Sequence, residues 1–231
     1  MSTLAHPQAP MNPRAQPAQP TESATGSLLA LARLLRLHLA SRRVPAALIA
    51  LAGCGVLMQW ATRSALSQST TSGARTSAEQ LALLLETAAA AVVSVAMHGP
   101  FGESERATGS RLYWLRLTSA LVLTGVALGA VAAGVAGTGM PQGVLAMTRD
   151  TAGMVGIGLL FAVIVGGHFA WVGPAGYFVI AAYAVADKWT SPWTWPARPS
   201  HDVGGAVCAL SLLAAAVLAI AVLGPRERGK D

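Results

Sequence analysis

VGGAVCALSLLAAAVLAIAVL, residues 203–223, contains no charged side chain. An α-helix rises 1.5 Å per residue, so a segment of about 20 apolar residues can cross the hydrocarbon core of a bilayer. Five more apolar segments precede this one, and they lie at 44–62, 78–97, 116–138, 151–169 and 173–187. The sequence therefore predicts an all-α, polytopic membrane protein with six transmembrane helices within residues 44–223.

The composition also favours lipid as the solvent. Of 231 residues, 53% are hydrophobic and 11% are charged, whereas a soluble domain carries about 25% charged residues. The net charge of +6 does not indicate a nucleic-acid partner, because the basic residues cluster beside the apolar segments, where lipid headgroups attract them. Cys54 and Cys208 lie inside apolar segments, which favours buried thiols over a disulfide.

The regions before and after the apolar segments have their own composition. Residues 1–25 are rich in Pro, Gln, Ala and Ser, which predicts a disordered tail, and residues 224–231 form a second, short tail. Residues 26–43 combine a leucine face with four arginines. This pattern predicts a basic amphipathic helix in the membrane interface. The alternative is an extension of the first membrane helix, which Pro45 disfavours.

The distribution of Lys and Arg predicts the orientation. With the N-terminus inside, eleven of these residues lie on the inner side and five on the outer side. The outer five are Arg63, Arg75, Arg149, Lys188 and Arg198. The bias places both termini in the cytoplasm. We expect an outer belt of tryptophans in the headgroups, formed by Trp60, Trp189, Trp193 and Trp195.

Glu86 lies within the second apolar segment, in the stretch LALLLETAAAA. A carboxyl group in the bilayer centre costs about 2.5–3.5 kcal/mol on insertion scales, so it should face a cavity or a partner, or be protonated. One interpretation places Glu86 on a translocation path or at a dimer interface. The other places it near the outer leaflet, about a third of the way down the span, where it reaches water.

Small residues recur every four positions in the third apolar segment. They are Gly125, Gly129, Ala133 and Gly137. Such a stripe lets another helix backbone approach closely, so we interpret it as a helix-packing face. The alternative is that the stripe reflects only the high Ala and Gly content of the chain.

No motif for catalysis, metal binding or nucleotide binding is present. The sequence lacks HExxH and the phosphate loop GxxxxGK[ST]. His98, His168 and His201 lie near different membrane boundaries, which favours interfacial or packing roles over a metal site. We therefore predict no catalytic residue, no metal and no cofactor, and the chain is not expected to be an enzyme.

Residues 98–116, HGPFGESERATGSRLYWLR, hold the densest mixed charge in the chain and lie between the second and third spans. The Gly-Pro-Phe-Gly stretch predicts a turn, and Glu103 or Ser104 can begin a short helix after it. Charge alone favours a solvated loop whose arginines fix the topology. The alternative is a surface that faces a soluble partner.

The order of these parts resembles the membrane subunit of ABC-2-type ABC transporters, in particular an actinobacterial branch. A basic interfacial helix, two spans, a charged inner loop, three spans, a Trp-rich outer segment and a last span follow one another. The family's turn is matched by Pro100, Phe101 and Gly102, and its charged run by Glu103, Glu105 and Arg106. Arg111 resembles the family's Arg-rich entry to the third span. Ser104 departs from the usual Leu, which affects the docking contacts more than the topology.

The resemblance implies that residues 26–43 are an elbow helix and that residues 98–116 carry a coupling helix. This helix would dock on a separate ABC ATPase, which binds the ATP. A second permease copy or a paralogue would complete an exporter in the plasma membrane of a bacterium. Two rival functions stay open, namely a non-transporting membrane scaffold or immunity protein, and an intramembrane enzyme that uses Glu86 and histidines.

Overall fold

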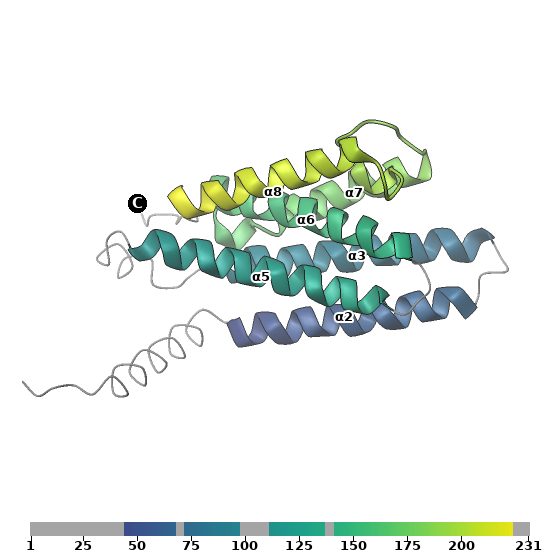
Figure 1. Ribbon diagram of the computed structural model, residues 1–231, viewed down its shortest axis with the longest axis horizontal. Helices are drawn as coiled ribbons and strands as arrows, with labels where there is room; N and C mark the ends of the chain where they lie inside the picture. The colour runs from purple at the N-terminus through teal and green to yellow at the C-terminus, as the bar shows by residue number, and fades with distance from the viewer. Residues whose placement is uncertain (1–43, 68–71, 98–110, 137–140, 224–231) are drawn as a thin grey trace, which may run out of the picture. The chain divides into compact units, whose positions relative to one another are not determined.

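The computed structural model describes residues 44–67, 72–97, 111–136 and 141–223 (Figure 1). These residues form six long helices, two short 3₁₀ turns and no strand. The predictions for the tails, for the interfacial helix over 26–43 and for most of the 98–116 segment lie outside the described residues. Of the coupling residues only Arg111 is described, as the first residue of α5, while the other six lie outside.

Within the described residues, six helices are long and apolar enough to cross a membrane. They are α2 (Val44–Ser67), α3 (Ser72–Ala96), α5 (Arg111–Val135), α6 (Pro141–Ile164), α7 (Val172–Ala186) and α8 (Val203–Leu223). A helix pairs its backbone groups internally, which is what a segment in lipid requires. The predicted all-α chain with six candidate spans is thus confirmed, and the chain has the architecture of a multi-pass membrane protein.

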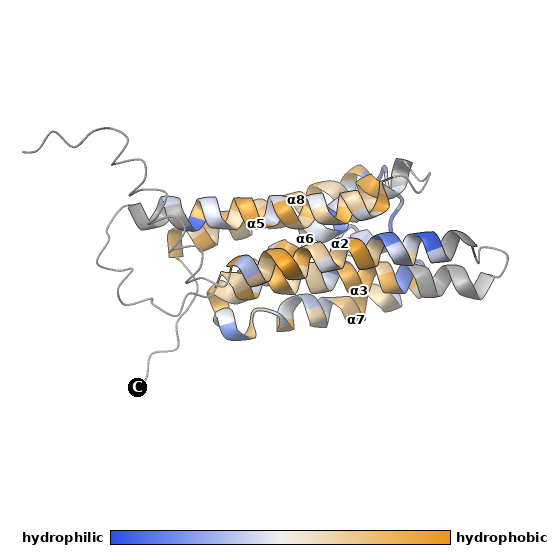
Figure 2. Cartoon of the chain, turned by 90° about the horizontal axis from the view of Figure 1, so that it is seen from below, coloured by the Kyte–Doolittle hydropathy of each residue, from blue (hydrophilic) through white to orange (hydrophobic). Residues whose placement is uncertain are grey.

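The helices divide into inner and outer ones. α6 packs against α3, α5, α7 and α8, and 61% of its span is buried, whereas only 22% of the span of α8 is buried. α2 lies against α3 and α5 and forms another outer helix (Figure 1). Hydrophobic residues run along the helices, and hydrophilic residues gather toward their ends (Figure 2). The outer helices therefore present apolar side chains to the surroundings.

The fourth span begins earlier than the sequence predicted. α6 begins at Pro141, and its candidate span is Gly143–Ile164 instead of 151–169. Proline suits the first turn of a helix because its missing N–H has no partner there. Arg149, which we counted among the outer-loop cations, therefore lies inside the span. That assignment was wrong, because the bundle supplies partners that make burial of the guanidinium possible.

A tight turn joins α6 to α7. Gly166 has φ 111°, a conformation that residues with a Cβ rarely adopt. The 3₁₀ turn η1 (Gly167–Phe169) follows it and leads into α7. This turn extends the fifth candidate span to Gly167–Ala186, beyond the 15 residues of α7 itself.

The close crossing of α2 and α5 depends on glycines outside the predicted stripe. A Cβ on Gly55 would lie 2.8 Å from the Ala130 carbonyl oxygen, and a Cβ on Gly134 would lie 2.7 Å from the Gly55 carbonyl oxygen. By contrast, Gly125 and Gly129 are exposed and have open space where a Cβ would lie. The predicted stripe is thus not a packing face within the chain, because the rotation of α5 turns it outward. Gly137 lies outside the described residues.

We predict that Gly55→Ala lowers the free energy of unfolding by about 1–3 kcal/mol, because the added methyl group overpacks the α2–α5 contact. Gly129→Ala is the matched control, and it should leave stability unchanged or raise it by up to about 1 kcal/mol through helix propensity. Equilibrium unfolding in detergent micelles measures both. Equal stability of the two variants would contradict the described crossing.

Candidate functional site

The candidate site is a group of buried charges near one end of the bundle. We call residues 187–202, which join α7 to α8, the connector, and the end where they lie the connector end. α3 and α6 both begin at this end. Glu86 follows the first residue of its span, Glu79, by seven residues, and Asp150 follows Gly143 by seven. Both carboxyl groups therefore lie about 10 Å into their spans.

Three ionisable side chains meet at this depth. Glu86 is 2% exposed, Arg149 is 5% exposed and Asp150 is 7% exposed. Arg149 donates a hydrogen bond from Nε to Oδ1 of Asp150 over 2.9 Å. Glu86 interacts electrostatically with both Asp150 and Arg149, and its Oε2 atom is buried without a hydrogen-bond partner. We call Glu86, Arg149 and Asp150 the charged triad.

Arg149 also binds the backbone of the connector. Its Nη1 atom donates to the carbonyl oxygen of Pro199 over 2.8 Å, and its Nη2 atom donates to that of Trp195 over 2.6 Å. A longer bond of 3.3 Å joins Nη2 to the carbonyl oxygen of Arg198. The carbonyl of Trp195 belongs to the first residue of the 3₁₀ turn η2 (Trp195–Ala197), and those of Arg198 and Pro199 lie just after this turn. One guanidinium thus joins a carboxylate inside a span to the folded connector.

Aromatic packing holds the same segment from α7. The rings of Tyr177 and Trp195 stack with centroids 4.7 Å apart, and the hydroxyl group of Tyr177 donates to the carbonyl oxygen of Trp193 over 2.6 Å. Trp195 is 2% exposed, and its indole lies where a side chain on Gly153 would project. The connector therefore returns into the bundle, and its position depends on α6 and α7 together.

The C-terminal part of the connector caps the N-terminus of α8. Asp202 immediately precedes α8 and accepts a hydrogen bond from the N–H of Gly205 over 2.6 Å, which is an N-cap. Arg198 donates to Oδ1 of Asp202 over 2.5 Å and to the carbonyl oxygen of Thr190. The bond from Arg198, followed by the bond from Gly205, holds the pKa of Asp202 below its ordinary value. Asp202 is therefore a carboxylate at neutral pH.

The structure corrects two sequence-based interpretations of this region. Glu86 does not reach water directly, because its side chain is almost fully buried within the chain. Trp195 is not part of an exposed belt, although Trp60, Trp189 and Trp193 are exposed. The Gly153 position opposite the indole explains the difference, since only a glycine leaves room for the ring there.

Sequence reasoning missed Arg149 and Asp150 as partners of Glu86. The available signal was Pro141 followed by the apolar stretch GVLAM at 143–147, which marks a helix start ten residues before the predicted one. His168 and His201 are exposed, and His168 lies at the α6–α7 turn, far along α6 from the triad. Among the described residues no three His, Cys, Asp or Glu side chains are placed to hold a metal ion.

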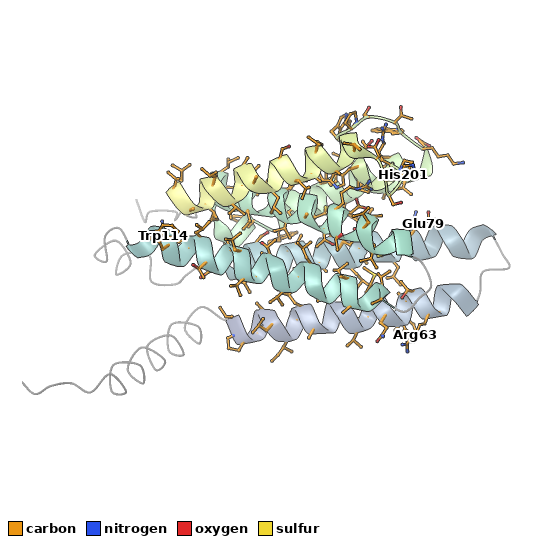
Figure 3. All side chains as sticks on the ribbon, in the orientation of Figure 1. Arg63, Glu79, Trp114 and His201 are labelled. Carbon is orange, nitrogen blue, oxygen red and sulfur yellow. The ribbon has the colours of Figure 1, made fainter. Side chains whose placement is uncertain are left out.

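We predict that Arg149→Ala lowers the free energy of unfolding by about 3–5 kcal/mol, because it leaves the buried carboxyl group of Asp150 without its counter-charge and removes the side-chain bonds to the connector. Arg149→Lys keeps the positive charge but lacks the planar guanidinium that donates several hydrogen bonds at once. Its decrease in the free energy of unfolding should therefore be intermediate. Arg63 is exposed at the same end of the bundle (Figure 3), and Arg63→Ala is the control. Unfolding in detergent measures all three variants. If Arg149→Ala and Arg63→Ala are equally stable, Arg149 does not hold the connector.

We predict that the start of α8 loosens when the pH falls far enough to protonate Asp202, a pH that its lowered pKa moves below the ordinary aspartate range. A carboxyl group whose pKa is lower in the folded than in the unfolded protein stabilises the fold at any pH above its unfolded-state pKa. This stabilisation is lost when the pH falls far enough to protonate the group in the folded protein. Asp202→Ala should speed hydrogen exchange at the Gly205 amide about five-fold at neutral pH. Asp202→Asn keeps an N-cap acceptor without a titrating group, so it should exchange slowly and show no pH step. A pH step in Asp202→Asn would contradict this account.

These observations describe a bundle of six candidate spans with a buried charged triad that Arg149 joins to a folded connector. In the charged triad, ionisable side chains of two spans, α3 and α6, meet in the interior. No family model, no curated protein and no solved structure matches the chain.

Proposed function

We propose that this chain is the membrane subunit of an ATP-driven exporter of the ABC-2 type, in the plasma membrane of a bacterium. The motif at Pro100, Phe101 and Gly102, with the charged run after it, supports this assignment. Because the sequence has no phosphate loop, a separate ATPase would bind the ATP. A second copy or a paralogue would complete the pathway, as the resemblance implies.

The observation that carries the proposal is the connector between the fifth and sixth spans. It folds back so that Trp195 is buried against α6 and α7, and Arg149 binds its carbonyl oxygens from inside a span. The resemblance implies extra structure at this position. Ionisable side chains inside membrane spans are costly and mark substrate or ion paths. We take this as support for transport over a scaffold.

In the proposed mechanism the ATPase acts at the opposite end of the bundle from the connector. Residues 98–110 join α3 to α5, and Trp114 near the start of α5 lies at the other end from Glu79 and His201 (Figure 3). Closure of the ATPase on ATP would favour one packing of the spans, and its opening would favour another. α3 runs from the docking loop to Glu86, so it would transmit the change to the charged triad.

We predict that the tagged full-length chain, isolated from its own cells in mild detergent, carries a phosphate-loop ATPase with it. The double change Glu105→Arg and Arg106→Glu should lower the recovered ATPase at least about ten-fold, because like charges across an interface cost several kcal/mol. Mass spectrometry and ATP hydrolysis of the eluate provide the measurements.

The control is the same charge swap at the connector end, Arg63→Glu with Glu79→Arg, since both side chains are exposed there (Figure 3). It should leave the complex intact. An unchanged complex after the Glu105 and Arg106 swap would remove the coupling role of residues 98–116. Recovery of the chain without any ATPase would favour the non-transporting membrane protein instead.

A further inference from the structure

The charged triad has unequal numbers of opposite charges. Arginine stays positively charged under all ordinary conditions, so Arg149 balances one of the two carboxylates. Glu86 and Asp150 are each more than nine-tenths buried. An isolated carboxylate away from water is very unfavourable. A second positive charge must therefore enter the triad, and the smallest one available is a proton.

The hydrogen bonds show which carboxyl group has a buried oxygen atom without a partner. Arg149 donates to Oδ1 of Asp150 and to the connector carbonyls, whereas Oε2 of Glu86 is buried with no partner. A charged carboxylate would attract the nearby guanidinium. The observed arrangement is the one expected for a neutral Glu86 beside an ion pair of Arg149 and Asp150.

The helices that pack against α3 contribute few ionisable groups near Glu86. The electrostatic neighbours of Glu86 are Asp150 and Arg149 of α6. Tyr177 of α7 interacts with Asp150, and Cys208 of α8 interacts with Tyr177. The other ionisable side chains described on α2, α5, η1 and α3 itself include Cys54, Arg63, Arg116, His168 and Glu79, and of these Arg63, His168 and Glu79 are exposed.

We propose that Glu86 is a proton-binding site in the membrane interior, and that its proton determines whether Arg149 holds the connector. With the proton bound, Arg149 pairs with Asp150 and binds the carbonyl oxygens of Trp195 and Pro199. When the proton leaves for water at the connector end, Glu86 becomes a carboxylate. It then competes for the guanidinium, the bonds to the connector break, and Trp195 leaves its site beside Tyr177. This inference goes beyond the proposed transport function and needs no ATPase.

The experiment uses the full-length protein in lipid nanodiscs between about pH 5 and about pH 9. Infrared difference spectroscopy follows the carboxylic acid C=O band, and ¹⁹F NMR of 5-fluorotryptophan follows Trp195, whose signal is assigned with Trp195→Phe. In the wild-type protein the band should disappear as the pH rises. We call Trp195 closed when it lies in its site beside Tyr177 and open when it has left that site. Over the same pH range the ratio of open to closed protein should change by about ten-fold per pH unit, which is the slope for one proton.

Two variants separate the roles of the carboxyl groups. Glu86→Gln leaves Arg149 with Asp150 alone, so it should lose the band and keep Trp195 closed at every pH. Asp150→Asn leaves Arg149 with Glu86 alone, so it should also lose the band but keep Trp195 open. Glu79→Gln, exposed at the start of the same span, should titrate like the wild-type protein.

Three results would overturn the inference. The first is a band that persists in Glu86→Gln. The second is the same Trp195 state in Glu86→Gln and Asp150→Asn. The third is a wild-type protein without the band whose Trp195 responds to sodium or potassium ions instead, because the added charge would then be a metal cation. A missing ATPase partner would leave all of these measurements unchanged, so the two proposals fail separately.

Discussion

Arg149 is the residue on which the connector end of the bundle depends. A guanidinium inside a membrane span is tolerated only when its N–H groups find acceptors and its charge finds a counter-charge. Asp150 supplies the counter-charge, and the carbonyls of Trp195 and Pro199 supply acceptors. The need is mutual, because the guanidinium also holds the turn that carries the buried Trp195 against α6. Each part thus makes the burial of the other possible.

The positions of Trp195 and of the start of α8 depend on the hydrogen bonds between Arg149 and the connector. Once η2 is held against α6, the indole of Trp195 lies beside Gly153 and stacks on Tyr177. The chain then leaves the connector at a fixed point, where Asp202 caps α8. α6 contacts all of these parts, which accounts for its deep burial compared with α8.

The sequence predicts which segments can lie in lipid better than it predicts which residues contact one another. Six apolar segments were recognisable because the bilayer sets a minimum length for each helix. The contacts depend on how each helix is rotated, which composition does not encode in a chain with 24 glycines. Gly55 therefore proved to be a packing residue, while Gly129 faces outward. Arg149 was misplaced because a charged residue looks like the edge of a span until its partners, fifty residues away, are known.

The shortness of α7 has a consequence for the surrounding lipid. Its 15 residues rise only about 22 Å, less than the roughly 30 Å of a typical hydrocarbon core. The Gly166 turn and η1 compensate for this at one end. Without this turn α7 alone would leave a hydrophobic mismatch, which bilayers relieve by thinning locally. The bend at Gly166 therefore lets a short helix sit in a membrane of ordinary thickness, because the turn brings the fifth span to the 20 residues of Gly167–Ala186.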